Sequence, residues 1–190
     1  MSRKGPALTD NEGVVRFDEY TRFNAPPGSR DELINGEVIL SPSPSRRHQD
    51  LCHAVQRLLE AAVLPGYVVR LDTTINLGIM EGPRPDVFVI DRARWIAADE
   101  HGGYPQGSPQ LVVEVRSESN TWPELQKKKD LFLRDAHCLA VWIVDPQELR
   151  VHLCESGSER VLNFTQTVPL PGSIGNGAIR IADIFSGIVQ

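Results

Sequence analysis

The spacing of apolar residues along the chain predicts two amphipathic helices. Between residues 45 and 63, apolar side chains recur at steps of three and four residues, as they do on one face of an α-helix: Leu51, Val55, Leu58, Leu59 and Ala62. A second helix is expected from roughly Pro123 to Ala136, because proline is acceptable in a first helical turn. A short helix is expected around residues 17–23.

Short β-favouring runs predict the strands. The run "ELINGEVIL" (residues 32–40) is centred on Asn35-Gly36, a pair typical of a two-residue type I′ turn, and therefore predicts a hairpin. The continuous apolar stretch "LAVWIV" is typical of a central strand. A loop rich in glycine and charge is expected between residues 91 and 110. The other strands are expected at residues 67–77, 86–90, 111–115, 149–154 and 160–164, with a last apolar segment at 179–185.

The order of these elements predicts one mixed α/β domain behind an N-terminal arm. The segment "NAPPGS" (residues 24–29) has the composition of a linker. We therefore expect residues 1–28 to form an arm with a short helix, and residues 29–190 to form a single domain with helices and strands packed together.

Composition excludes several classes of protein. The net charge of −5 gives no overall attraction for polyanions, which argues against a tight DNA binder. The chain starts without an apolar leader and has no apolar run of membrane-spanning length, so we expect a cytoplasmic protein without a membrane partner. Its three cysteines are widely spaced and form no C-x-x-C pair, which argues against a disulfide scaffold or a zinc cluster and for small buried side chains.

The first candidate for chemistry is Glu114, which interrupts the apolar run "LVVEV". An ionised carboxylate in an apolar strand is costly unless a cation, a metal or hydrogen-bond donors compensate it. On the second predicted helix, Lys129 lies within about 60° of four apolar residues, so it is expected on the inward face, aimed at Glu114. Those four are Leu125, Phe132, Leu133 and Ala136. The alternative is that the lysine follows its four-carbon stem to the solvent.

Three other polar residues are more ambiguous. Asp86 opens the strand "DVFVI", where aspartate is disfavoured, although it could simply cap the preceding proline-rich turn. Glu37 follows the Asn-Gly turn, where an exposed carboxylate is the ordinary case. His48 lies on the apolar stripe of the first helix, where a hydrogen-bonded core histidine is the ordinary case.

Taken together, these residues suit a metal-dependent hydrolase. Carboxylates are preferred ligands of Mg²⁺ and Mn²⁺, and a divalent cation lowers the pKa of water that it binds. Two acids on successive strands, a further acid upstream and an inward lysine are therefore the parts needed to hydrolyse a phosphodiester.

Four blocks of the sequence resemble one family. "ELINGEVILSPSPSRRHQ", "RPDVFVI", "PQLVVEVRSES" and "KKKDLFLRDAHCLAVWIVDP" are similar, in this order, to the Uma family of "putative restriction endonucleases", a bacterial branch of the PD-(D/E)xK nuclease superfamily. The resemblance covers roughly residues 15–185. It implies a restriction endonuclease-like fold, in which helices flank a central mixed β-sheet and further antiparallel strands follow at the C-terminal end.

The resemblance also implies roles for individual residues. Asp86 and Glu114 would be ligands of Mg²⁺ or Mn²⁺, together with the backbone carbonyl of Val115. Lys129 would orient or deprotonate the attacking water, and Glu37 would support the metal from upstream. In addition, His48 matches a histidine of the family as a possible auxiliary residue. DNA as substrate and assembly into homo-oligomers are likewise implied by the resemblance alone.

Arg116 departs from the superfamily's commonest pattern, in which a lysine lies two residues after the second acid. Arginine does not act as a base at ordinary pH, so Arg116 could only clamp phosphate or pair with a carboxylate. A salt bridge from Arg116 to Glu114 would weaken metal binding and leave the site inert. The sequence thus predicts a Mg²⁺-dependent nuclease acting on DNA. The alternatives are a catalytically inactive module of the same fold that serves binding or assembly, and hydrolysis of another substrate.

Overall fold

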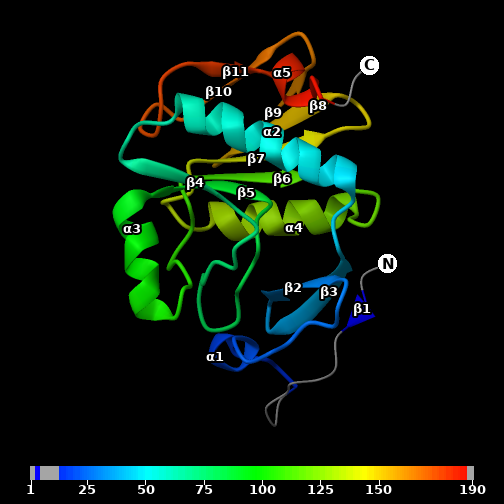
Figure 1. Ribbon diagram of the computed structural model, residues 1–190, viewed down its shortest axis with the longest axis vertical. Helices are drawn as coiled ribbons and strands as arrows, with labels where there is room; N and C mark the ends of the chain where they lie inside the picture. The colour runs from blue at the N-terminus through cyan, green and yellow to red at the C-terminus, as the bar shows by residue number, and fades with distance from the viewer. Residues whose placement is uncertain (1–2, 5–12, 188–190) are drawn as a thin grey trace.

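The computed structural model describes residues 3–4 and 13–187, and its helices are interspersed among groups of strands along the chain (Figure 1). The helices are α1 (Phe17–Tyr20), α2 (Arg46–Ala62), α3 (Arg92–Ala97), α4 (Trp122–Leu133) and α5 (Ile181–Phe185), with a 3-10 turn η1 (Ala98–His101). The strands are β1 (Arg3–Lys4), β2 (Ser29–Ile34), β3 (Glu37–Pro42), β4 (Tyr67–Leu71), β5 (Val87–Asp91), β6 (Leu111–Val115), β7 (Ala140–Asp145), β8 (Arg150–Glu155), β9 (Ser158–Asn163), β10 (Thr167–Pro169) and β11 (Ala178–Arg180).

A six-stranded mixed sheet forms the centre, in the order β4-β5-β6-β7-β8-β9. Strands β6 and β7 pair in parallel and the other neighbours are antiparallel. Helix α2 covers one face of this sheet and α4 covers the other (Figure 1). The expected mixed sheet flanked by helices is therefore confirmed, as are the additional antiparallel strands near the C-terminal end, β10 and β11.

Residues of the central strands alternate between the two helix layers, since successive side chains of a strand point to opposite faces. Val87 and Val113 pack in the core with α2, whereas Phe88 and Val112 pack in the core with Leu125 and Phe132 of α4. Because Glu114 follows Val113, its side chain faces the α4 layer. This alternation decides which helix can supply a partner for Glu114.

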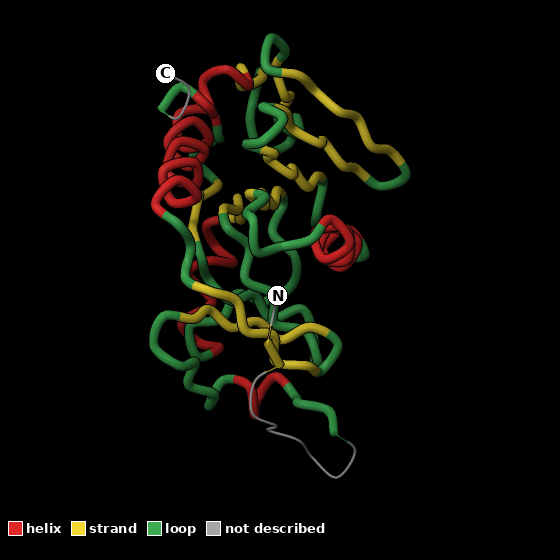
Figure 2. The backbone as a smooth tube through the Cα atoms, turned by 90° about the vertical axis from the view of Figure 1, so that its right-hand side faces the viewer, coloured by secondary structure: helices red, strands yellow, loops and turns green. Residues whose placement is uncertain are grey.

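The N-terminal hairpin forms a second, smaller unit with its own apolar cluster. Its turn has positive φ at Asn35 (51°) and Gly36 (71°), as a type I′ turn requires, so the hairpin prediction is confirmed. Phe17 and Tyr20 of α1 pack against Leu33 of β2. Figure 2 shows this unit at the opposite end of the molecule from α5, with the main sheet between them. The expected division of the chain at residue 28 stays a prediction.

Three parts of the chain differ from the expected elements. The segment after β5, expected as a loop, begins with α3, because the Asp91 carboxylate accepts hydrogen bonds from the backbone N–H groups of Ala93 (2.8 Å) and Arg94 (3.1 Å) and caps the helix. The last apolar segment divides into β11 and α5, and β4 is shorter than expected. Within residues 13–187, no helix has both the length and the apolar character needed to span a membrane.

Candidate active site

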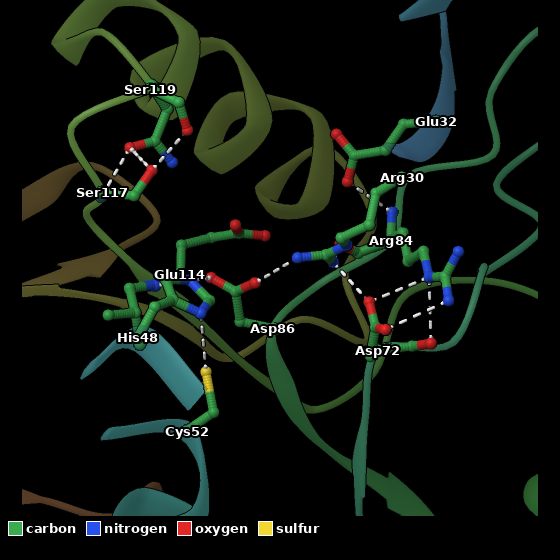
Figure 3. Close-up of polar contacts among 12 residues, drawn as sticks. Arg30, Glu32, His48, Cys52, Asp72, Arg84, Asp86, Glu114, Ser117 and Ser119 are labelled. Carbon is green, nitrogen blue, oxygen red and sulfur yellow. Dashed lines mark hydrogen bonds and ion pairs between the residues drawn. The ribbon is translucent and has the colours of Figure 1, made fainter. Parts of the chain in front are cut away.

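Asp86 and Glu114 come together at one end of neighbouring strands. Strands β5 and β6 pair with Val87 opposite Val113, so continuing the register by one residue places Asp86 opposite Glu114. Both carboxylates are almost fully buried, with 5% and 2% of the residue exposed. Figure 3 shows the two side chains close to each other, with Asp86 flanked by His48 and Arg30. The fold therefore brings two acids together in one buried site.

The cation that compensates Glu114 is Lys128. Its Nζ lies 2.9 Å from the Glu114 carboxylate and 2.8 Å from Oε1 of Glu32, on β2. The Lys128 side chain is only 14% exposed. Because a buried carboxylate requires a charged or hydrogen-bonding partner, this ammonium accounts for the glutamate in an apolar strand.

The expected contact between Lys129 and Glu114 is wrong, because the buried face of α4 is shifted by one residue. Leu131, which lies about 200° around the helix from Lys129, is buried, whereas Ala136 lies beyond the helix end and is exposed. The middle of the buried face therefore falls on Lys128. Lys129 instead forms an ion pair with its neighbour Asp130, at 3.1 Å.

Asp86 is held from three directions. Its Oδ1 accepts a hydrogen bond from Arg30 Nη1 (2.9 Å), while its Oδ2 accepts one from the backbone N–H of Val115 (2.8 Å) and lies 3.2 Å from Nε2 of His48. On the other side of the imidazole ring, Nδ1 lies 3.5 Å from Sγ of Cys52. His48, predicted as an auxiliary residue, is thus brought to the site by the first turn of α2, whose N-cap is Ser45.

These surroundings move the pKa values of the two acids in opposite directions. Burial alone would raise the pKa of Asp86, but the hydrogen bond and charge of His48, and then the charges of Arg30 and Lys128, hold it well below its usual range. For Glu114, burial raises the pKa to about 8, against the lowering effect of Lys128. Paired carboxylates with divergent pKa values are typical of functional sites.

The donor set fits a divalent cation with oxygen ligands. Glu114 Oε1 is buried and its one charged neighbour among the described residues is the Lys128 ammonium, 2.9 Å away, with no well-aligned hydrogen bond. Carboxylate oxygens from two strands are the ligand type that Mg²⁺ and Mn²⁺ prefer. Possible ligand atoms of His48, Cys52 and Asp86 also lie within 4.8 Å of one another. Within that group the imidazole lies between the other two residues, with Nε2 facing Asp86 and Nδ1 facing Cys52.

Arg116 does not pair with Glu114. Its Nη1 donates to Oδ2 of Asp145, which is fully buried at the end of β7, at a distance of 3.0 Å. The salt bridge between Arg116 and Glu114 is thus absent from the described structure. Glu114 pairs with Lys128 instead, and Arg116 pairs with Asp145.

Two acids of the hairpin border the site. Glu37 is exposed at the start of β3 and lines the same cavity as Asp86, so its supporting role stays a prediction. Glu32, which sequence reasoning missed, contacts both Lys128 and the backbone N–H of Arg84 (3.0 Å). Glu32 and Arg30 share one face of β2 by two-residue alternation. The sequence alone could have predicted that these two side chains share a face of the strand. Only the packing of the hairpin shows that this face is turned to Asp86 and Glu114.

The acids lie at the inner end of a cavity of about 860 Å³. Three connections border it: residues 42–45 before α2, residues 116–120 after β6, and residues 146–147 after β7. In the second of these, the backbone N–H and hydroxyl of Ser117 donate to Oδ1 of Asn120, at 2.7 Å and 3.0 Å. One wall of the pocket is therefore a connection held by its own hydrogen bonds.

The chain matches one known protein family. The sequence model of the Uma2 family, described as "Putative restriction endonuclease", matches residues 17–179. The chain belongs to the Uma2 family. The matched range contains every site residue named above, from Arg30 to Asp145.

A solved structure supports the fold of this Uma2 protein. A "putative nuclease belonging to DUF820" from Anabaena variabilis ATCC 29413 superposes with a TM-score of 0.79 and 20% sequence identity, covering 92% of this chain and 99% of that one. At this identity the likeness shows the shared fold alone. No curated protein matches the chain.

Proposed function

We propose that this Uma2 protein is a divalent metal-dependent nuclease that cleaves phosphodiester bonds in DNA. The observation that carries the proposal is the meeting of Asp86, Glu114 and Lys128 in one buried site at the inner end of a pocket. Membership of a family described as "Putative restriction endonuclease" supports the same reaction class.

Each of these residues has a defined part in the proposed reaction. Asp86, Glu114 and the backbone carbonyl of Val115 would hold Mg²⁺ or Mn²⁺. When bound, the cation would supply Lewis-acid stabilisation of the phosphate and lower the pKa of a water molecule. Lys128 would orient the attacking water and stabilise the charge that develops on the phosphate, since its ammonium is fixed by Glu32 and Glu114. Arg30, His48 and the Val115 N–H hold Asp86 in one orientation.

The primary test is calorimetric titration with Mn²⁺. The native protein is expected to bind the ion, and Glu114→Gln is expected to weaken binding by at least about tenfold, because an amide cannot lose a proton to become an anionic ligand as the carboxyl can. Glu118→Gln, which changes an exposed acid of the same pocket, is the matched control and should leave affinity unchanged. Absence of Mn²⁺ binding by the native protein would refute the proposal.

If the ion binds, cleavage of circular DNA in single-stranded and double-stranded form then tests the reaction.

The alternative is a catalytically inactive module of the same fold. One observation favours it: both oxygens of Asp86 already contact protein groups, so a metal must share or displace Arg30 or His48. A protein that binds Mn²⁺ but leaves both forms of DNA intact would support this alternative.

A second prediction concerns which upstream acid supports the site. Glu32→Gln is expected to lower the cleavage rate by about tenfold, since it removes one of the two anions that hold the Lys128 ammonium. Glu37→Gln, a change of the same chemistry on the neighbouring strand, provides the comparison. Initial rates at saturating Mg²⁺ measure both. A larger loss for Glu37→Gln would return the supporting role to Glu37, as the family resemblance implied.

A further inference from the structure

The shape of the pocket limits what can reach the acids. Its volume of about 860 Å³ lies within the range of pockets that bind small molecules, roughly 300–1,000 Å³. The two carboxylates are buried at its inner end, behind the connections at residues 42–45, 116–120 and 146–147. A DNA duplex is far larger than such a pocket, so a phosphate of a paired strand would stay outside. A flexible unpaired strand can enter.

The charges around the pocket also disfavour a duplex. Among the described lining residues, Arg30 and Lys128 are held by the acids of the site, and three further cations line the pocket: Arg47, Lys127 and Arg116, which pairs with Asp145. Exposed Glu37 and Glu118 lie among them. Proteins that grip duplex DNA typically neutralise about 6–10 phosphates, and this chain carries a net charge of −5. The lining therefore suits contact with one or two phosphates.

Arg116 is placed to make such a contact. It lies on the pocket wall, two residues after Glu114, and its side chain is 29% exposed. One nitrogen donates to the fully buried Asp145, which fixes the direction of the side chain. A guanidinium carries five N–H donors in a planar fork that matches phosphate oxygens, so the ion pair leaves donors for a ligand.

On this basis, and resting on the proposed nuclease function, we propose that the pocket binds an unpaired DNA strand. One phosphate of the strand lies at the site formed by Asp86, Glu114 and Lys128. Arg116 binds a neighbouring phosphate of the same strand. Enzymes that modify a base inside a duplex likewise act on a single strand or must first flip that base out of the stack. Arg116 is thus a substrate-binding residue.

The test compares the two arginines that share Asp145. Arg150 also faces this carboxylate, at 3.7 Å, but does not line the pocket. Binding of a fluorescein-labelled 12-nucleotide DNA, alone or annealed to its complement, is measured by fluorescence anisotropy with Ca²⁺ present. The single strand is expected to bind at least about tenfold more tightly than the duplex. Arg116→Gln should weaken its binding by roughly 10- to 100-fold, the usual worth of a charged hydrogen bond, and Arg150→Gln should not.

The outcomes separate this inference from the proposed function. If the duplex binds as tightly as the single strand or more tightly, the inference is overturned. It is also overturned if Arg116→Gln and Arg150→Gln weaken single-strand binding equally, because both arginines would then only neutralise Asp145. Arg116→Gln should also raise KM for single-stranded DNA while Mn²⁺ affinity stays at the native value. If the native protein does not bind Mn²⁺, the proposed nuclease function itself is refuted.

Discussion

Lys128→Met is expected to lower the rate of DNA cleavage at least about a hundredfold, whereas Lys129→Met should stay within about threefold of the native rate. Only Lys128 contacts Glu114, and positioned groups that transfer protons or stabilise developing charge typically contribute two to four orders of magnitude. The two substitutions change neighbouring residues of α4 in the same way. Initial rates with Mg²⁺ on circular DNA measure the difference.

Folding of the Lys128 variant can be checked separately. Removing the ammonium leaves Glu114 buried without its cation, but this carboxyl can take up a proton, because burial raises its pKa to about 8 even beside Lys128. Thermal unfolding of both variants below pH 7 should therefore show folded proteins. A native cleavage rate in folded Lys128→Met would contradict the role assigned to this lysine, and a large loss in Lys129→Met alone would restore the original assignment.

Asp86→Asn is expected to abolish Mn²⁺ binding and to lower the free energy of unfolding by about 3–5 kcal/mol, the usual cost of breaking a buried ion pair. The buried Arg30 guanidinium would lose one of its two anionic partners and would keep only Asp72, at 2.6 Å. Urea unfolding in the absence of metal measures this change in the free energy of unfolding. Asp50→Asn, an exposed acid of α2, is the control and should change stability little.

The stability difference between native protein and Asp86→Asn should depend on pH. The pKa of Asp86 is lower in the folded protein than in the unfolded chain, so its ionised form stabilises the fold above the unfolded pKa, near 4. As pH falls below about 4, the unfolded chain takes up a proton first, and this contribution declines progressively until the pH reaches the lower pKa of the folded protein. Urea unfolding between pH 3 and pH 7 should show the two proteins converging at the acid end. A difference that stays constant with pH would show that the carboxylate charge is not the cause.

Periodicity alone was sufficient for much of the architecture. The Asn35-Gly36 turn, the amphipathic α2 and the apolar central strands follow from local patterns whose physical causes are local: positive φ in a tight turn, three- to four-residue spacing, and burial on both faces of a sheet. The helix α3 was missed because its start depends on a single capping carboxylate, Asp91, in a segment otherwise rich in glycine and charge.

By itself, the sequence determined that Glu114 needed a partner and that a lysine of the second helix was the candidate, because a buried carboxylate cannot stay uncompensated. Only the tertiary structure decided that the lysine is Lys128, since neighbouring helical residues lie 100° apart and the rotation of α4 depends on what packs beneath it. The same holds for Glu32 and Arg30, whose strand has two possible faces, and for Arg116, whose partner Asp145 comes from the adjacent parallel strand. Contacts between distant segments depend on how whole elements are oriented against each other, and local spacing carries no information on that orientation.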